Sequence, residues 1–211
     1  MQKKILLVSI LILILSGCMK IDKNSQNYIS IINNCLNTKT ISNDVALGYK
    51  YYLPKGVKLI QNYDYNQKFS VGQNDLYMYV DINSYYYKSK LKKQTSDNYY
   101  YHKIKKGKKT GYISISKSNN LYFTKIVYNY AKMEFYSNSN DLNNLITLST
   151  IILNSIDYND IIIEKVLGEN LGDYSEITYE LKKPEDASND FSQYLEEYVQ
   201  EDKSEKKLPD E

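Results

Sequence analysis

The sequence of 211 residues contains no arginine and no tryptophan, one histidine, two cysteines and three prolines. Its single imidazole, His102, excludes the two-histidine zinc motif and any site that needs several histidines. The chain also has no GxSxG segment, no GxxxxGK[ST] loop and no CxxC pair, which excludes serine-hydrolase elbows, P-loops and dithiol redox motifs. We therefore expect no catalytic residues, no metal and no cofactor, and a protein that is not an enzyme.

Four residue types dominate what is present. Lysine, isoleucine, tyrosine and asparagine fill 96 of the 211 positions, and all four have codons rich in A and T. Base composition in a low-G+C bacterium explains this bias most simply, so abundant tyrosine or lysine does not by itself indicate a function. Hydrophobic residues make up 42% of the chain and charged residues 25%, as in globular proteins, and the length suits one domain with appendages.

The N-terminal 18 residues read MQKKILLVSILILILSGC, a basic start followed by an apolar run at residues 5–15 and then by small residues. Eleven residues rise about 16 Å as a helix, half of what a membrane-spanning helix needs, so the segment is predicted to be a secretory signal. Its last four residues, LSGC, resemble the lipobox of bacterial lipoproteins. This resemblance implies that residues 1–17 are removed and that the Cys18 thiol carries a diacylglyceryl group.

The expected location follows from this lipid anchor. Two acyl chains, of the palmitate type, hold a protein firmly at a membrane, and no later segment offers about 18 consecutive apolar residues. We therefore expect a lipid-anchored protein on the extracytoplasmic face of the cell membrane. With Cys18 acylated, Cys35 has no partner for an internal disulfide. It lies on an apolar helical stripe with Tyr28, Ile31, Ile32 and Leu36, and a buried structural cysteine is favoured over a reactive thiol.

The mature chain shows two hydrophobic periodicities. Period 3.6 predicts helices at residues 25–37 and 141–156 and around residues 191–199. Extended or alternating patterns predict strands at residues 49–53, 57–60, 76–82, 99–104, 112–116, 121–136 and 174–181. Residues 160–167 fit either a helix or a strand. Turns are expected at residues 54–56, 106–108 and 118–120.

This order of elements predicts an α+β fold, a meandering antiparallel sheet packed by an N-terminal helix and by the helix near residues 141–156, with a small C-terminal helical extension. We expect a signal peptide at residues 1–17, a lipidated tether at 18–24, an α+β domain at 25–167, a strand and helix extension at 168–200 and a charged flexible tail at 201–211. The stretch LGYKYYLPKGVKLI, followed by strands and a helix ending in ILNSI, resembles the Mog1/PsbP-like group of α+β domains. That resemblance implies a scaffold used for binding and assembly.

Charge is distributed unevenly along the chain. Residues 50–132 hold 16 lysines against four acidic residues, whereas residues 133–211 hold six lysines against 19 acidic residues. Either the acidic part folds back against the basic part, or two faces address different partners. Within the basic part, residues 88–109 contain nine lysines interleaved with tyrosines. The candidate polyanion-binding residues are Lys103, Lys105, Lys106, Lys108 and Lys109; a solvated, lysine-rich edge strand is the alternative.

These observations favour a lipid-anchored, non-enzymatic binding or interaction module at the cell envelope. Its expected partners are the membrane, reached through the diacylglyceryl-cysteine, and an anionic lipid headgroup, a cell-wall polymer or an envelope protein. Export removes the protein from most nucleic acid, and we expect no nucleic-acid partner. The alternatives are a solute-capturing lipoprotein and a small envelope enzyme. A pocket of several hundred Å³ lined by convergent polar groups would favour these alternatives, whereas an extended patch would favour protein or envelope contact.

Overall fold

The computed structural model describes residues 23–91, 99–169 and 174–183. In chain order, its elements are α2 (Lys23–Asn37), β1 (Asp44–Ala46), β2 (Tyr49–Tyr51), β3 (Lys58–Tyr63), β4 (Asn66–Val71), β5 (Asn74–Val80), α3 (Ile82–Tyr86), β6 (Tyr100–Lys106), β7 (Lys109–Ser118), β8 (Leu121–Tyr128), β9 (Ala131–Ser137), α4 (Ser139–Ser155), β10 (Asp157–Tyr158) and α5 (Asp160–Gly168). The predicted signal peptide, Cys18, the helix around residues 191–199 and the charged tail lie outside these ranges.

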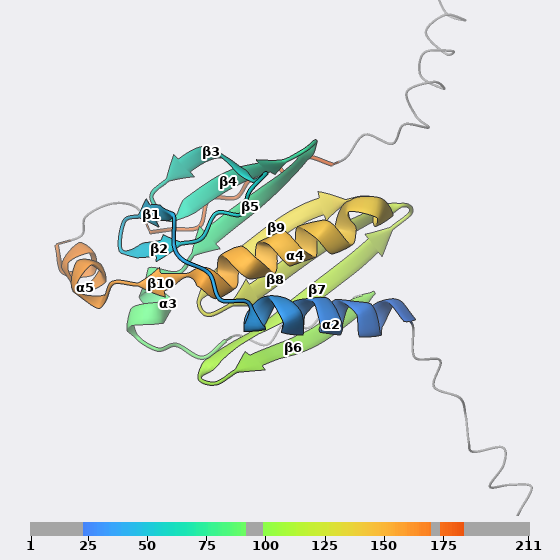
Figure 1. The fold of residues 1–211 in the computed structure, drawn as a ribbon. Coiled ribbons are helices and arrows are strands. Elements are labelled where there is room, and N and C mark those ends of the chain that lie inside the picture. The colour runs from blue at the N-terminus through green and yellow to red at the C-terminus, as the bar shows by residue number, and fades with distance from the viewer. Residues whose placement is uncertain (1–22, 92–98, 170–173, 184–211) are drawn as a thin grey trace, which may run out of the picture.

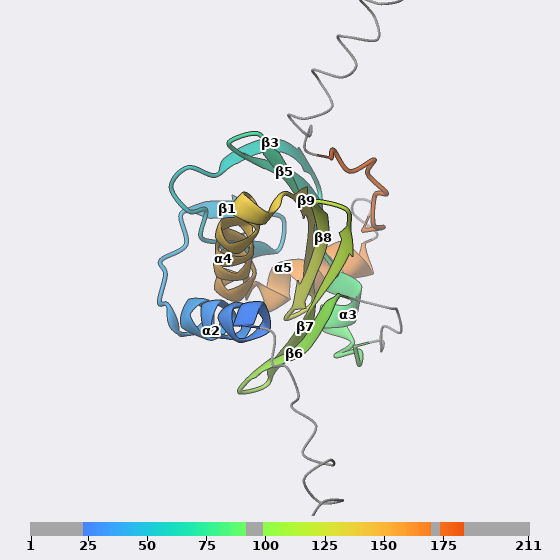
Figure 2. The same ribbon diagram turned by 90° about the vertical axis from the view of Figure 1, so that its right-hand side faces the viewer.

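The main sheet has seven antiparallel strands in the order β3-β4-β5-β9-β8-β7-β6 (Figure 1). A small sheet, β1-β2-β10, lies at one end. Helices α2 and α4 cover one face of the main sheet, and α3 and residues 174–183 lie on the other, which we call the outer face (Figure 2). The predicted α+β class is therefore confirmed, with two meanders joined where β5 pairs with β9.

The core lies between the main sheet and the two long helices. Helix α4 buries Leu142, Leu145, Ile146, Ile152 and Leu153, the face that the 3.6-residue period predicts. The helix begins where the Asn138 side chain accepts hydrogen bonds from the first free backbone N–H groups.

Helix α2 packs against α4 and the edge of β6. It buries Tyr28, Ile32, Cys35 and Leu36, as the apolar stripe predicts. The Cys35 thiol donates a hydrogen bond to the Thr147 carbonyl at 3.7 Å, and burial raises the pKa of this thiol. The predicted burial of Cys35 is confirmed.

Residues 121–136 do not form the single long strand that alternation predicted. They form β8 and β9, joined by a tight turn in which Asn129 and Tyr130 have φ of 51° and 66°. Positive φ at both central residues belongs to the turn type that matches the twist of antiparallel strands. Buried positions are even-numbered in β8 and odd-numbered in β9. The shift of the buried positions from even to odd numbers places the turn at Asn129 and Tyr130. The residue types alone do not indicate a turn there, because Asn-Tyr is not a common turn pair.

Other elements also differ from the expectations. Ile82 begins α3 instead of ending a strand, whereas residues 160–167, expected as either a helix or a strand, are helical in α5. Residues 174–181 form no strand. The Asn66 side chain instead accepts from the Ile177 N–H at 2.9 Å and donates to the Ser175 carbonyl at 2.9 Å. A side chain therefore holds this segment on the outer face in place of a strand ladder.

Candidate functional site

Two adjoining hollows lie on the outer face of the sheet. The smaller, of about 240 Å³, is the lysine pocket, lined by Lys88, Ser89, Lys90, Leu91, Lys108, Lys109, Thr110, Asn129 and Tyr130. The larger, of about 440 Å³, is the central hollow, whose polar lining includes Tyr79, Asp81, Tyr112, Tyr130, Lys132 and Glu176. Both are lined by Ser89, Lys90, Leu91 and Tyr130. We treat them together as the candidate binding site.

A third hollow of about 690 Å³ lies between Tyr136 on β9 and residues 179–183. Five of its six lining residues are consecutive in one segment without helix or strand. It is an open recess beside the chain, whereas the other two hollows are built by several elements of the fold.

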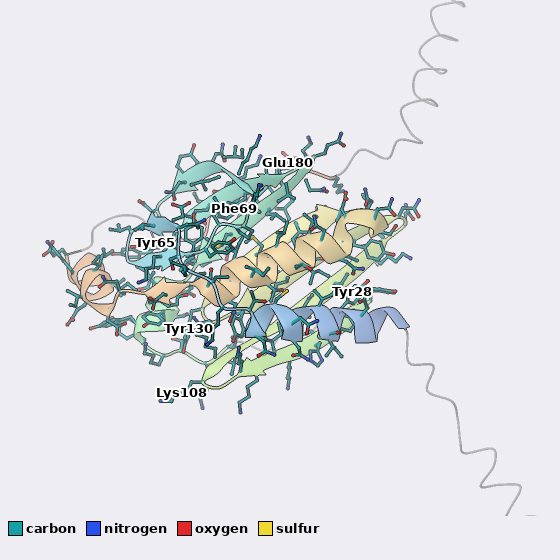
Figure 3. The ribbon with its side chains drawn as sticks, viewed as in Figure 1. Tyr28, Tyr65, Phe69, Lys108, Tyr130 and Glu180 are labelled. Atoms are coloured by element: carbon teal, nitrogen blue, oxygen red, sulfur yellow. The ribbon has the colours of Figure 1, made fainter. Side chains whose placement is uncertain are left out.

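Three segments distant in sequence build the lysine pocket. Lys88, with φ of 51°, turns the chain at the end of α3 and leads into Lys90. Lys108 and Lys109 come from the β6–β7 hairpin, whose Gly107 has φ of 59°, which suits the first central position of a two-residue turn. The β8–β9 turn completes the wall. Figure 3 labels Lys108 at the hairpin tip and Tyr130 at the same end of the sheet.

Hydrogen bonds fix the β8–β9 turn against its neighbours. The Tyr158 hydroxyl donates to the Asn129 carbonyl at 2.7 Å, and the Asp81 N–H donates to the Tyr130 carbonyl at 2.9 Å. The Asn129 N–H donates to the Thr110 carbonyl at 3.1 Å. Because these bonds tie the turn to β10, to the end of β5 and to β7, this wall is held in place without a ligand.

An aromatic contact holds α3 and its following turn. The Tyr85 ring stacks on Tyr158 with centroids 3.8 Å apart, and its hydroxyl donates to Asp160 Oδ1 at 2.7 Å. Burial, together with this hydrogen bond to Asp160, raises the pKa of Tyr85 to about 12. The Lys88 ammonium lies 3.7 Å from the Tyr85 ring centroid, a cation–π contact that positions this charge at the pocket.

The structure divides the five lysines that sequence reasoning grouped together. Lys103 and Lys105 are exposed on edge strand β6. The Lys106 ammonium donates to the Leu36 carbonyl in the last turn of α2, where the helix dipole favours a cation. Only Lys108 and Lys109 line the pocket. The pKa of Lys109 lies below its ordinary value, mainly because the side chain is partly buried. The negative charge of Asp157 opposes this shift, and the positive charge of Lys106 adds to it.

Lys88 and Lys90 were not among the candidate residues, although both belong to the lysine-rich stretch of residues 88–109. Their lysine identity was the only signal in the sequence. Nothing local indicates that they meet Lys108 and Lys109, because this contact depends on where β6 pairs in the sheet.

The acidic part of the chain does contact the basic sheet. Lys50 pairs with Asp157 at 3.2 Å, and Lys132 pairs with Glu134 at 2.7 Å and with Glu176. Lys125 also pairs with Glu134, at 2.7 Å. Among the ion pairs between described residues, none includes a lysine of the lysine pocket. Within the described residues, ion pairs therefore neutralise part of the basic charge and leave the lysines of this pocket outside any ion pair.

Residues with catalytic or ligating side chains are scattered in the described ranges. His102 is half-buried on β6, its ring centroid 6.5 Å from that of Tyr100, whereas Cys35 is buried beneath α4. No group of three or more His, Cys, Asp and Glu side chains gathers there to hold a metal ion. Within the same ranges, the helices lack the length and apolar character needed to cross a bilayer.

The fold thus defines an α+β domain with two long helices on one sheet face and a partly hollowed outer face. No known protein family, curated protein or solved structure matches this chain. The likeness to Mog1/PsbP-like domains stays a prediction from sequence.

Proposed function

We propose that this chain is an extracytoplasmic lipoprotein, anchored to the cell membrane through Cys18, whose domain binds a ligand or partner and catalyses no reaction. The observation that carries the proposal is the LSGC motif after a basic start and a short apolar run. Four residues separate Cys18 from Lys23 at the start of α2. At about 3.5 Å per residue, a lipidated Cys18 keeps that helix end within about 18 Å of the bilayer surface.

The outer face supports the binding part of the proposal. Hydrogen bonds and stacking preform a wall of the lysine pocket, and the central hollow beside it brings together polar groups from three strands, α3 and residue 176. Binding sites are concave and largely preformed, with a few polar groups that orient the ligand.

Capture of a small solute is the second candidate function. The central hollow of about 440 Å³ favours it, because its volume and convergent polar lining fit a small molecule better than a flat protein partner. The two candidates share the anchor and differ in the ligand that the outer face receives.

The anchor is tested by intact-mass analysis of the protein purified from membranes. We expect chains that begin at Cys18 and carry a diacylglyceryl thioether, whereas Cys18→Ala removes both the cleavage and the lipid. Cys35→Ala is the matched control, since this buried cysteine takes no part in anchoring, and it keeps the lipid. A native N-terminus with an uncleaved leader or with an unmodified Cys18 thiol would overturn the proposal.

A further inference from the structure

We propose that the lysine pocket binds a phosphate group, with the organic part of the ligand lying in the central hollow. This inference rests on the proposed binding function and names the ligand class for the same site. The observation behind it is the convergence of Lys88, Lys90, Lys108 and Lys109 on one hollow of about 240 Å³.

Four lysines, Lys88, Lys90, Lys108 and Lys109, line the pocket. None of the described residues that line the pocket is acidic; Asp157, which acts electrostatically on Lys109, does not line the pocket and pairs with Lys50 at 3.2 Å. Like charges in one hollow repel each other, and a bound anion relieves that repulsion. Partial burial of Lys109 adds to the effect, since a desolvated ammonium gains more from an anionic partner than an exposed one does.

The chemistry of the lining fits phosphate. Lysine ammoniums are compact point charges that bind phosphate without demanding planar, two-point geometry. Ser89 and Thr110 add hydroxyl groups and Asn129 adds an amide, so hydrogen-bond donors accompany the charge. The volume corresponds to about eight water molecules, enough for a phosphate and part of its substituent. The shared lining residues, which include Tyr130, then lead to Tyr112 in the central hollow.

Phosphate could reach this site from a phospholipid headgroup or from a soluble phosphate ester. The hairpin tip lies at the end of α2 opposite its anchored end, because Lys106 contacts the Leu36 carbonyl. A helix of 15 residues is about 22 Å long, so the pocket lies within a few tens of ångströms of the anchored end of α2, a distance at which either source can reach it.

The test measures binding to the full chain in neutral detergent by calorimetry. One arm uses inorganic phosphate and sn-glycerol 3-phosphate, and the other uses phosphatidylcholine bicelles with and without phosphatidylglycerol. We expect the double variant Lys90→Gln/Lys109→Gln to weaken binding at least tenfold in one arm. Lys90→Arg/Lys109→Arg, which keeps both charges, should stay within about threefold of the parent chain.

The matched control is Lys55→Gln/Lys58→Gln, which removes the same charge from two exposed lysines near the start of β3. We expect it to change binding less than twofold. Binding in the soluble arm identifies a soluble phosphate ester, and binding in the bicelle arm alone identifies a headgroup. No binding in either arm, or equal losses in the two glutamine variants, would overturn the inference. The intact mass at Cys18 is independent of both results.

Discussion

Removing single tyrosine hydroxyls from the core should change stability in opposite directions at two positions. The Tyr51 hydroxyl donates to Asp44 Oδ2 at 2.9 Å across the β1–β2 pair. The Tyr128 hydroxyl is buried and has no hydrogen-bond partner among the described residues. Both side chains are at least 99% buried, so Tyr51→Phe and Tyr128→Phe remove one oxygen atom from comparable surroundings.

The expected magnitudes follow from hydrogen-bond energetics. A bond to a charged acceptor contributes about 1.5 to 3 kcal/mol, and partial exposure of Asp44 places Tyr51→Phe near a loss of about 1.5 kcal/mol. A buried hydroxyl without a partner costs about 1 to 3 kcal/mol, so Tyr128→Phe should be neutral or stabilising by up to about 1 kcal/mol after local repacking. For a domain of this size, each kcal/mol moves the melting temperature by about 2 to 4 °C.

The two variants are compared by urea denaturation and by thermal melting followed by circular dichroism. Tyr51→Phe should melt several degrees below the parent chain, and Tyr128→Phe at or above it. A loss above about 1 kcal/mol in Tyr128→Phe would show that its hydroxyl has a partner, and it would refute the reasoning. The expected result would also agree with a core that takes tyrosine from biased base composition and not from a need for its hydroxyl.

Two further predictions concern the sheet. Gly111→Ala should lower the free energy of unfolding by at least about 3 kcal/mol in urea denaturation, because a Cβ at this position would lie 2.0 Å from a backbone oxygen of β8. Gly168→Ala is the control and should be neutral or slightly stabilising, since a Cβ there meets nothing within 4 Å. Equal effects of the two substitutions would contradict this packing. Burial alone would raise the pKa of Glu134, but hydrogen bonds from Lys125 and Lys132 hold it below its usual value of 4.5. Its ionised form therefore stabilises the fold above pH 4.5, and that contribution is lost as pH falls through the lowered pKa. Glu134→Gln should be less stable than the parent chain at pH 7, with a gap that narrows below pH 4.5; a gap independent of pH would contradict the assignment.

Several elements could be predicted because their signals are local. The helical stripes of α2 and α4, the alternation in β5 and the Gly107 turn each depend on neighbouring residues. Strands β1 and β10 have three and two residues, too few to show a period. They form only because β2 lies between them.

The candidate site was predicted in part. Lys108 and Lys109 were named from the lysine-rich hairpin, and both line the lysine pocket. Lys106 was named for the same reason but contacts α2. Alternation along β6 separates side chains between two faces, yet it does not show what covers either face.

The sequence by itself determined the apolar helix faces, the hairpin turn, the excess of lysine in one stretch and the LSGC motif, because all of these depend on short spacings along the chain. Only the tertiary structure decided which charges meet. After β5 the chain passes through α3 and enters the sheet again at the far edge as β6, and three strands later β9 pairs with β5. This pairing order brings the residues after α3 beside the β6–β7 hairpin and the β8–β9 turn. Electrostatic interaction depends on distance in space, so the sheet pairing, and not the sequence, decides that four lysines from two separate segments line one pocket.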